Sequence, residues 1–311
     1  MEITAQDVAK LREITGVGLM ACKKALIATN GDIDKACEYL REQGMSVAAK
    51  KASRIAAEGA VWSATSEDKH VGALVEVNCE SDFVAKSDVF VKLCGNIAAA
   101  VVKSGKENPE ELYKVKTAEG TIEELITTAT SKTGEKISLR RATILSNPKG
   151  IEEAYIHMGG KMGTLVEIAC EGLAADKVAQ VVTMAHDVAM HVAAFQPTYV
   201  RKEDVPASAV EREREIIHQQ LLNDEKNKNK PEAVLVKIAE NKLGKFYEEN
   251  CLLYQAFAKD PSIKVEQLVA QTAKAVGAKL EVVRFVKLVM GEGIEKRTDN
   301  LAEEVAKLAQ K

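Results

Sequence analysis

The sequence predicts an α+β protein built from several parts, and three patterns in the chain carry that prediction. Residues 1–45 contain three short helical patterns separated by glycine-containing breaks. Beyond them, apolar runs rich in β-branched residues alternate with helical patterns. The segment Gly72–Glu80 also recurs, with changes, at Gly163–Glu171. We therefore expect a small N-terminal three-helix domain, two related α+β core subdomains from an internal duplication, an inserted antiparallel helical-hairpin arm and a C-terminal helix.

The composition argues against several classes of protein. With a net charge of −3 and 4% aromatic residues, the chain lacks the basic field and the stacking platforms typical of nucleic-acid binding. Its six cysteines form no C-x-x-C pair and none has the spacing of a metal ligand, so we expect reduced thiols rather than disulfides or zinc. We find no leader pattern and no apolar run of membrane-spanning length, so we expect a cytoplasmic protein that binds no membrane.

The first expected domain spans residues 1–55 and consists of a three-helix docking unit with its linker. Thr4 and Asp7 resemble a capping box at the start of the first helix. Two more helices follow, and the last is expected to end at Gly44. Residues 15–18 (Thr-Gly-Val-Gly) are not interpreted as a phosphate loop, because they follow a helix and lack a Gly-Lys-Ser/Thr ending.

The core N-subdomain is expected over residues 56–148. Its predicted elements, in chain order, are a hairpin of Ala60–Ala64 and Ala73–Val77, a helix after Ser87, a helical stretch over residues 110–133 broken at Gly120, and a strand over Ile137–Leu145 that Arg140 and Arg141 interrupt.

Within this subdomain, the chemistry of Gly72–Lys86 changes abruptly where the strand ends. Turn-forming and capping residues follow the apolar run, and Asp82-Phe83 stands at the corner before the next helix. A corner fixes a side chain while its tip stays reachable, which suits contact with a partner. The structural alternative is that Asp82 caps a short helix and Phe83 folds back into the core.

The two copies of the repeat differ at this corner. Asp82-Phe83 in the first copy corresponds to Leu173-Ala174 in the second. A purely structural cap would be expected in both copies, so the difference favours a functional role for the pair. Conversely, His191 stands where the first copy has Ala100. A lone histidine among small apolar residues is more often a core or interface residue than a catalyst.

The second copy belongs to a core C-subdomain expected over residues 149–290. Residues 205–248 indicate two antiparallel amphipathic helices joined by a polar turn, an arm whose apolar stripes need a partner or each other. Residues 291–311 are expected to form a C-terminal module with a helix over Leu301–Leu308.

Two long motifs resemble the signatures of the bacterial translation elongation factor Ts family. The stretch Leu11–Leu26, followed by Asn30-Gly31-Asp32, is similar to the N-terminal signature of that family, and Glu76–Lys86 is similar to its second signature. The family usually has Thr-Asp-Phe in the second motif, whereas this chain has Ser81 and so keeps the hydroxyl. The resemblance covers essentially the whole chain.

This resemblance implies a guanine-nucleotide exchange factor for elongation factor Tu, a GTPase that holds GDP tightly, and not an enzyme. It implies that Asp82 and Phe83 act near the Mg²⁺ and phosphate site, while Met162 and His191 press a second region and displace the phosphate loop. The other implied contacts are Ser81, Val84, Met20 and Lys23. No cofactor and no metal of its own are expected, and the arm of the family suggests a homodimer or a 2:2 complex.

Two alternatives from other classes are kept. One is a ubiquitin-associated-type adaptor that binds a peptide or nascent chain through residues 1–45, which predicts activity from that fragment alone. The other is an enzyme that uses His191 or Cys79 as base or nucleophile. No third partner is evident for either residue, which argues against catalysis.

Overall fold

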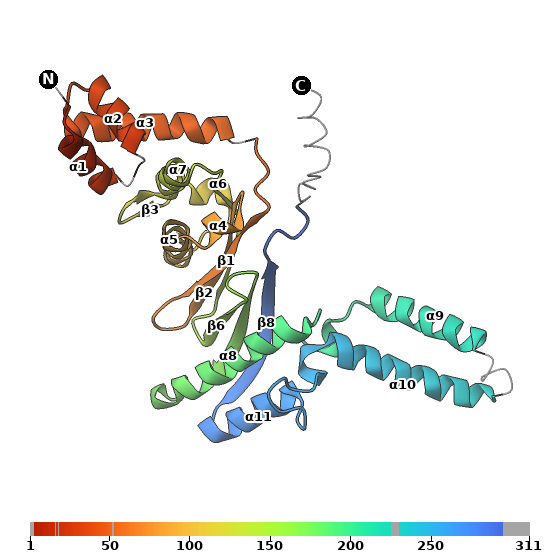
Figure 1. The fold of residues 1–311 in the computed structure, drawn as a ribbon. Helices are drawn as coiled ribbons and strands as arrows, with labels where there is room; N and C mark the ends of the chain where they lie inside the picture. The colour runs from red at the N-terminus through yellow and green to blue at the C-terminus, as the bar shows by residue number, and fades with distance from the viewer. Residues whose placement is uncertain (1–2, 16, 18, 52, 225–229, 295–311) are drawn as a thin grey trace, which may run out of the picture.

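The computed structural model describes residues 3–15, 17, 19–51, 53–224 and 230–294 (Figure 1). The described chain is an α+β protein in which three helices precede a region of helices and antiparallel sheets, as the sequence predicts. The polar turn of the predicted arm lies partly outside the described residues, and the predicted terminal helix over 301–308 lies wholly outside them.

The N-terminal module consists of α1 (Ala5–Thr15), α2 (Leu19–Ala28) and α3 (Ile33–Lys51), packed around a small core that includes Leu11, Cys22, Leu26 and Ala36. The predicted capping box forms, because the Asp7 amide donates to Thr4 Oγ1 and the Thr4 amide donates to Asp7 Oδ2.

The prediction that the third helix ends at Gly44 is wrong, since α3 continues to Lys51. Gly44 is instead a packing residue: a Cβ there would lie 3.5 Å from the Cβ of Ser131 on α7 (Ile122–Thr133). This is an ordinary van der Waals distance, so Gly44 lies at the contact between the two helices rather than at a helix end. Arg41 pairs with Glu124 of α7 and the Lys51 ammonium donates to the Gly134 carbonyl, so α3 is fastened to α7 along its length.

The first sheet has the antiparallel order β1-β2-β5, with β1 (Glu58–Thr65) and β2 (Val71–Cys79) forming the predicted hairpin and β5 (Ser138–Ser146) beside β2. Helices α5 (Asp88–Ser104) and α7 cover one face and bury a cluster around Phe90 and Ile97.

The predicted helix over residues 110–133 is wrong in its first half. That stretch forms α6 (Pro109–Leu112) and a two-stranded ribbon of β3 (Lys116–Thr117) and β4 (Gly120–Thr121) before α7 begins. Thr121 and Glu124 form a capping box that fixes the start of α7, a signal that the sequence contains.

The second sheet has the same order, with β6 (Gly150–His157), β7 (Met162–Glu171) and β8 (Lys279–Val289). Its outer face is covered by α8 (Val178–Phe195) and α11 (Val265–Val276). The stretch Ala175–Phe195 is long and apolar enough to cross a membrane by length and composition. Here α8 packs on β6 and β7, where residues such as Val181, Val188 and Val192 are buried, so its apolar face is explained by the core.

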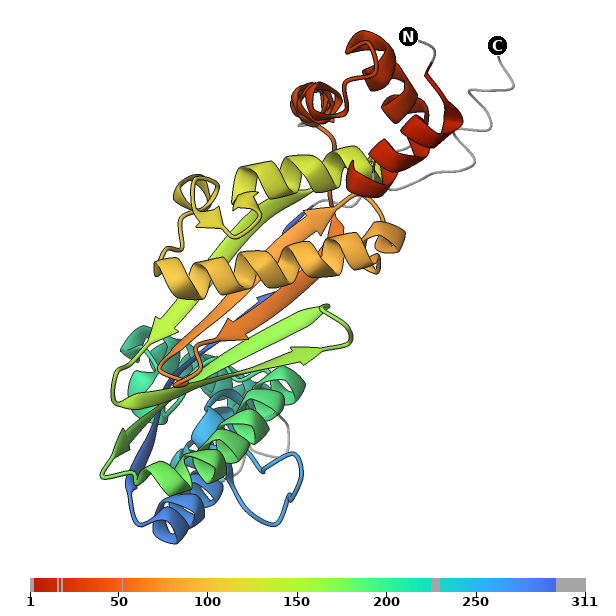
Figure 2. The ribbon, with the colours of Figure 1, turned by 90° about the vertical axis from the view of Figure 1, so that its left-hand side faces the viewer.

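The two sheets lie face to face between their helices (Figure 2). An apolar layer including Val61, Leu74, Leu145, Leu165 and Leu288 fills the space between them. The Val61 amide also donates across this joint to the Gly160 carbonyl at 2.8 Å. The sheets therefore form one four-layer body rather than two separate units.

The inserted arm consists of α9 (Ala207–Asn223) and α10 (Glu232–Asn250), which project away from this body (Figure 1). In the described arm helices, only Ile217 and Leu221 are buried, and apolar side chains such as Ile216, Leu222 and Val236 stay exposed.

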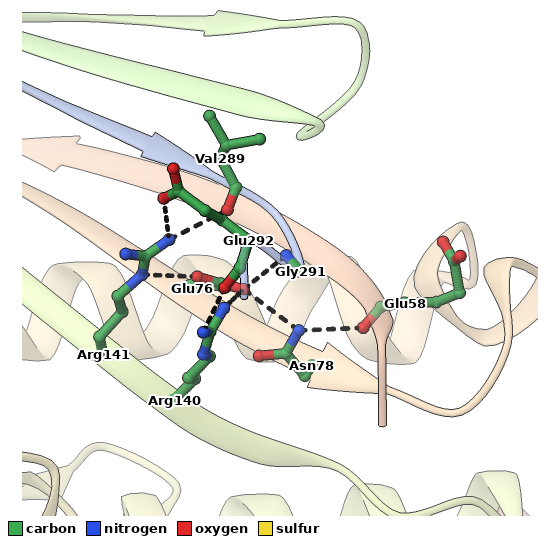
Figure 3. A network of polar contacts seen from close by, with 8 residues as sticks. All are labelled: Glu58, Glu76, Asn78, Arg140, Arg141, Val289, Gly291 and Glu292. Atoms are coloured by element: carbon green, nitrogen blue, oxygen red, sulfur yellow. Dashed lines mark hydrogen bonds and ion pairs between the residues drawn. The ribbon is translucent and has the colours of Figure 1, made fainter. Parts of the chain in front are cut away.

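A buried carboxylate links the first sheet to the chain beyond β8 (Figure 3). Glu76 accepts hydrogen bonds from Arg140 Nη1 at 2.9 Å, Arg141 Nε at 2.6 Å and the Gly291 amide at 2.8 Å. Burial alone would raise the pKa of Glu76, but the amide and the two arginines outweigh it and hold the pKa below its usual value.

This cluster corrects the expectation that Arg140 and Arg141 interrupt the strand. Both arginines lie within β5, and a bulge in the pairing between Glu76 and Val77 lets two consecutive residues reach one carboxylate. The second sheet has a bulge at the corresponding position, where Glu167 binds Arg284 at 2.7 Å.

Replacing Glu76 by alanine should strongly destabilise the fold. Removing one partner of a buried ion pair costs about 3–5 kcal/mol, because the remaining charges stay buried without compensation. Urea unfolding followed by circular dichroism measures this loss. The matched control is Glu119→Ala, which removes an exposed ion pair with Lys92 and should cost about 0–1 kcal/mol. Equal losses in the two variants would contradict the role assigned to Glu76.

Candidate partner-binding surface

The corner after β2 is held rigidly by hydrogen bonds to Ser81. This residue is the N-cap of the short helix α4 (Asp82–Ala85), and its hydroxyl accepts from the Val84 amide at 3.3 Å. Glu135, just after α7, accepts from the Ser81 amide at 2.9 Å and from its hydroxyl at 2.6 Å. The corner is therefore anchored both to its own helix and to a neighbouring element.

Phe83 points out of this rigid corner. Its side chain is 84% exposed, whereas the neighbouring Val84 packs against the core cluster of the first sheet. The alternative that Phe83 folds back into the core is thus wrong, and the cap is Ser81 rather than Asp82. A large apolar side chain exposed on a fixed support is typical of an interaction site.

Asp82 places a negative charge beside this ring. Its carboxylate is half-exposed and accepts a hydrogen bond from Lys86 Nζ at 2.7 Å. That bond, together with the positive charge of Lys86, lowers the pKa of Asp82. The corner therefore presents an aromatic ring and an ionised carboxylate side by side at neutral pH.

The turn between β6 and β7 comes close to this corner. A Cβ at Gly160 would lie 2.6 Å from the Cβ of Ala60, so the turn packs directly on β1. The Lys161 ammonium binds Glu58 at 2.9 Å and also contributes to lowering the pKa of Asp82. The structure thus joins the corner on the first sheet and the turn on the second into one surface.

Met158, rather than Met162, is the exposed methionine of this turn. Met158 has a φ of 47° and a side chain that is 74% exposed. Met162 is only partly accessible, and since Gly163 faces the joint between the sheets, strand alternation turns Met162 toward the side covered by α8. Sequence reasoning missed Met158, although its place before two glycines indicated a turn.

The structure places the His191 side chain in the core, and its contact with a partner stays a prediction. The ring is fully buried, the Ala258 amide donates to its Nδ1 at 3.1 Å, and its Nε2 lies 2.9 Å from Gln255 Oε1. Because Nδ1 accepts, Nε2 must donate, and the imidazole is neutral. Burial lowers the pKa of His191 accordingly.

Phe195 is the exposed aromatic residue at this end of α8. Its ring stacks on His191 with centroids 4.7 Å apart and planes 15° from parallel, and its side chain is 53% exposed. His191 thus supports an accessible aromatic ring from beneath.

Met20 and Lys23 lie on a separate element. Met20 is 69% exposed on α2, and with Lys23 and the exposed Ile27 it shares the helix face opposite buried Cys22, Ala25 and Leu26. The N-terminal module that carries them packs on α7, which in turn packs on α5, so α7 separates the module from α5 (Figure 2). These residues therefore form a second exposed patch that the structure does not merge with the Asp82-Phe83 corner.

The residues considered for catalysis have no suitable environment. Cys79 is buried, its thiol donates to the Ser81 carbonyl, and burial raises its pKa to about 12, which disfavours the nucleophilic thiolate. His191 is equally inaccessible. Across the described residues, no three His, Cys, Asp or Glu side chains lie close enough together to hold a metal ion.

Comparisons with known proteins agree on one family. The family described as Elongation factor TS matches residues 80–292. The chain is 43% identical to elongation factor Ts of Clostridium perfringens (strain SM101 / Type A) over 310 residues, which is 99% of this chain and 100% of that protein. It is 44% identical to elongation factor Ts of Clostridium tetani over 99% of this chain and 100% of that protein. It is 45% identical to that of Clostridioides difficile over 98% of both chains.

Phe83→Ala should leave the free energy of unfolding within about 0.5 kcal/mol of the parent, because an exposed ring contributes little to the core. Phe90→Ala, which removes the same side chain from a fully buried site, should cost about 3–5 kcal/mol. Urea unfolding of both variants tests the contrast. A large loss for Phe83→Ala would mean that the ring packs in the core in solution.

The buried neutral His191 should make stability depend on pH. Its pKa in the folded protein lies below the ordinary value of 6.5, so below about pH 6.5 the unfolded chain binds more protons and stability falls. The slope from this one group is at most about 1.4 kcal/mol per pH unit. Thermal unfolding of the parent and of His191→Gln between pH 5 and pH 8 should show a shallower acid decline in the variant. Parallel declines would exclude the effect.

Proposed function

The chain belongs to the elongation factor Ts family and is therefore a nucleotide-exchange factor for elongation factor Tu rather than an enzyme, and we propose that the Asp82-Phe83 corner is its principal lever. The single observation that carries this proposal is the exposure of Phe83 on a corner fixed by Ser81 and Glu135. As a translation factor, the chain acts in the cytoplasm.

The thermodynamic requirement is simple. An exchange factor must bind the nucleotide-free GTPase more tightly than the GDP-bound form, and reciprocity then requires GDP to bind less tightly when the factor is present. The contacts of the factor must therefore favour a GTPase conformation in which the Mg²⁺ and phosphate site is disturbed.

The corner supplies two such contacts. The Phe83 ring inserts into an apolar crevice of the GTPase domain, where burying a Phe contributes about 1.5–3 kcal/mol. Asp82 brings a negative charge toward the hydrogen bonds and the Mg²⁺ shell beside that crevice. Ser81 fixes the backbone and Val84 anchors the helix in the core. The Phe83 ring therefore keeps its exposed position when it contacts the GTPase.

A second contact comes from the other sheet and displaces the phosphate loop. The exposed Met158 and Phe195 make this contact together with Met162 at the start of β7, and His191 supports the Phe195 ring on which it stacks. Met20 and Lys23 on α2 dock elsewhere on the GTPase domain and hold the complex together.

The domain arrangement supports a duplicated core. We assign residues 1–55 to docking, 56–148 and 149–290 to two related subdomains, 205–248 to the arm and 291–311 to a C-terminal module. The equal strand order of the sheets and the paired bulges at Glu76 and Glu167 support this duplication. The incompletely covered apolar surface of the arm supports a homodimer or a 2:2 complex.

Stopped-flow release of a fluorescent GDP analogue from bacterial elongation factor Tu tests the proposal. The parent should accelerate release, and Phe83→Ala and Asp82→Ala should each reduce the acceleration by about tenfold or more, the equivalent of 1.4 kcal/mol. Val283→Ala on β8 is the matched control, because it removes an exposed apolar side chain outside all the proposed contacts and should leave release unchanged.

The outcomes separate the candidate functions. No acceleration by the parent would overturn the exchange-factor assignment, and activity of residues 1–55 alone would favour the peptide-binding adaptor. If both corner variants still accelerate GDP release, the contact responsible would be assigned to the second sheet. Phe195→Ala would then be the decisive variant.

A further inference from the structure

The joint between the two sheets contains a carboxyl group without a partner. Glu152 on β6 is fully buried, and neither of its carboxyl oxygens has a hydrogen-bond partner within the described chain. It faces the first sheet, since a Cβ at Gly72 would lie 2.9 Å from the Cβ of Glu152. Its neighbours Ile151 and Glu153 point the other way, toward α8.

We propose that Glu152 is a proton latch: its protonation favours the closed joint between the two sheets, and opening of the joint releases that proton to solvent. The inference goes beyond nucleotide exchange and does not depend on it.

The charges around Glu152 explain why it must be neutral in the closed joint. Its register partner on β7 is Glu167, a second buried carboxylate. The nearby cation, Arg284 on β8, is already bonded to Glu167 at 2.7 Å, and Asn147 donates to the other oxygen of Glu167 at 2.9 Å. Ionised Glu152 would therefore be a buried negative charge beside another negative charge.

The remaining charged and titratable groups nearby bind partners other than Glu152. Lys69, on the turn of the β1–β2 hairpin, binds Glu153 at 2.9 Å, and His186 of α8 lies 3.3 Å from the other oxygen of Glu153. His70 Nδ1 lies 2.8 Å from the Gly150 carbonyl oxygen. Asp68 of the same turn accepts from Ser66. Burial first, and then the charge of Glu167, raise the pKa of Glu152 to about 8, and Arg284 offsets this only in part.

The direction of the pH effect follows from linkage. In an open joint Glu152 is hydrated and titrates near its ordinary value of 4.5, whereas in the closed joint it titrates near 8. Between these values each opening releases a proton, so the opening constant rises about tenfold per pH unit. Above about pH 8 both states are ionised and the rise stops.

Opening would alter the proposed partner surface. The Asp82-Phe83 corner belongs to the first sheet and the Met158 turn to the second. Separating the sheets changes the spacing between these two groups, so the state of one buried proton is coupled to the shape of the surface.

Two amides bridge the sheets and report on opening. The Glu152 amide donates to the Lys69 carbonyl at 2.7 Å, and the Val61 amide donates to the Gly160 carbonyl at 2.8 Å. Native-state hydrogen exchange of these amides, followed by nuclear magnetic resonance on the full chain between pH 5.5 and pH 7.5, measures the product of opening constant and intrinsic rate. The Val75 amide in the central strand β2 reports on global unfolding.

The proposal predicts a distinctive slope. Intrinsic amide exchange rises about tenfold per pH unit, so the logarithm of the rate should rise with a slope of about two at the bridging amides of the parent protein. The slope should fall to about one in Glu152→Gln and in Glu152→Leu, which cannot ionise. Glu153→Gln is the matched control on the opposite face and should keep the slope of two.

Two results would overturn the latch. One is a slope of one at the bridging amides of the parent. The other is exchange of the bridging amides at the same rate as Val75, because proton release would then accompany only global unfolding. In Glu152→Gln the buried amide of the new side chain could itself loosen the joint because it lacks a partner. The Glu152→Leu variant controls for this effect because leucine has no polar group.

Discussion

The closest approach between the two sheets depends on positions that carry no side chain. A Cβ at Gly163 would lie 2.5 Å from Val61 Cγ1, and one at Gly72 would meet Leu165 Cδ1 at 2.6 Å. These are the same glycines that open the two copies of the repeated segment. Face-to-face packing at this distance in turn places the β6–β7 turn on β1, and thereby beside the Asp82-Phe83 corner. The proposed partner surface depends on this contact.

Buried charge is distributed unequally along the same joint. At one end, two arginines and a backbone amide neutralise Glu76. At the other end, Arg284 and Asn147 satisfy Glu167, and Glu152 is left without a partner among the described residues. An ion pair with full hydrogen bonding tolerates burial, whereas an unpaired carboxyl must stay neutral. The joint therefore has one end that holds its charges at all ordinary pH values and one that responds to protons.

Local signals in the sequence identified most elements, and tertiary contacts account for what it missed. The hairpin, the capping box at Thr4 and the corner at Asp82 depend on neighbouring residues, so they were predictable. The continuation of α3 through Gly44 accompanies its packing on α7, which no local pattern reveals. In the same way, the bulge that brings Arg140 and Arg141 onto Glu76 is a property of strand pairing. The burial of His191 and the exposure of Phe195 are set by which face of α8 meets the sheet.

The long α3 helix has a consequence for how binding energy adds up. It ends at Lys51, which holds Gly134, and the next residue, Glu135, holds Ser81 at the base of the Phe83 helix. The α2 face and the Phe83 ring are thus connected through packed helices rather than through a flexible tether. If both proposed contacts form, docking of one presents the other at a high effective concentration, with little further loss of conformational entropy on binding. Under this proposal, a small helical module can contribute nearly all of its interaction energy to the complex.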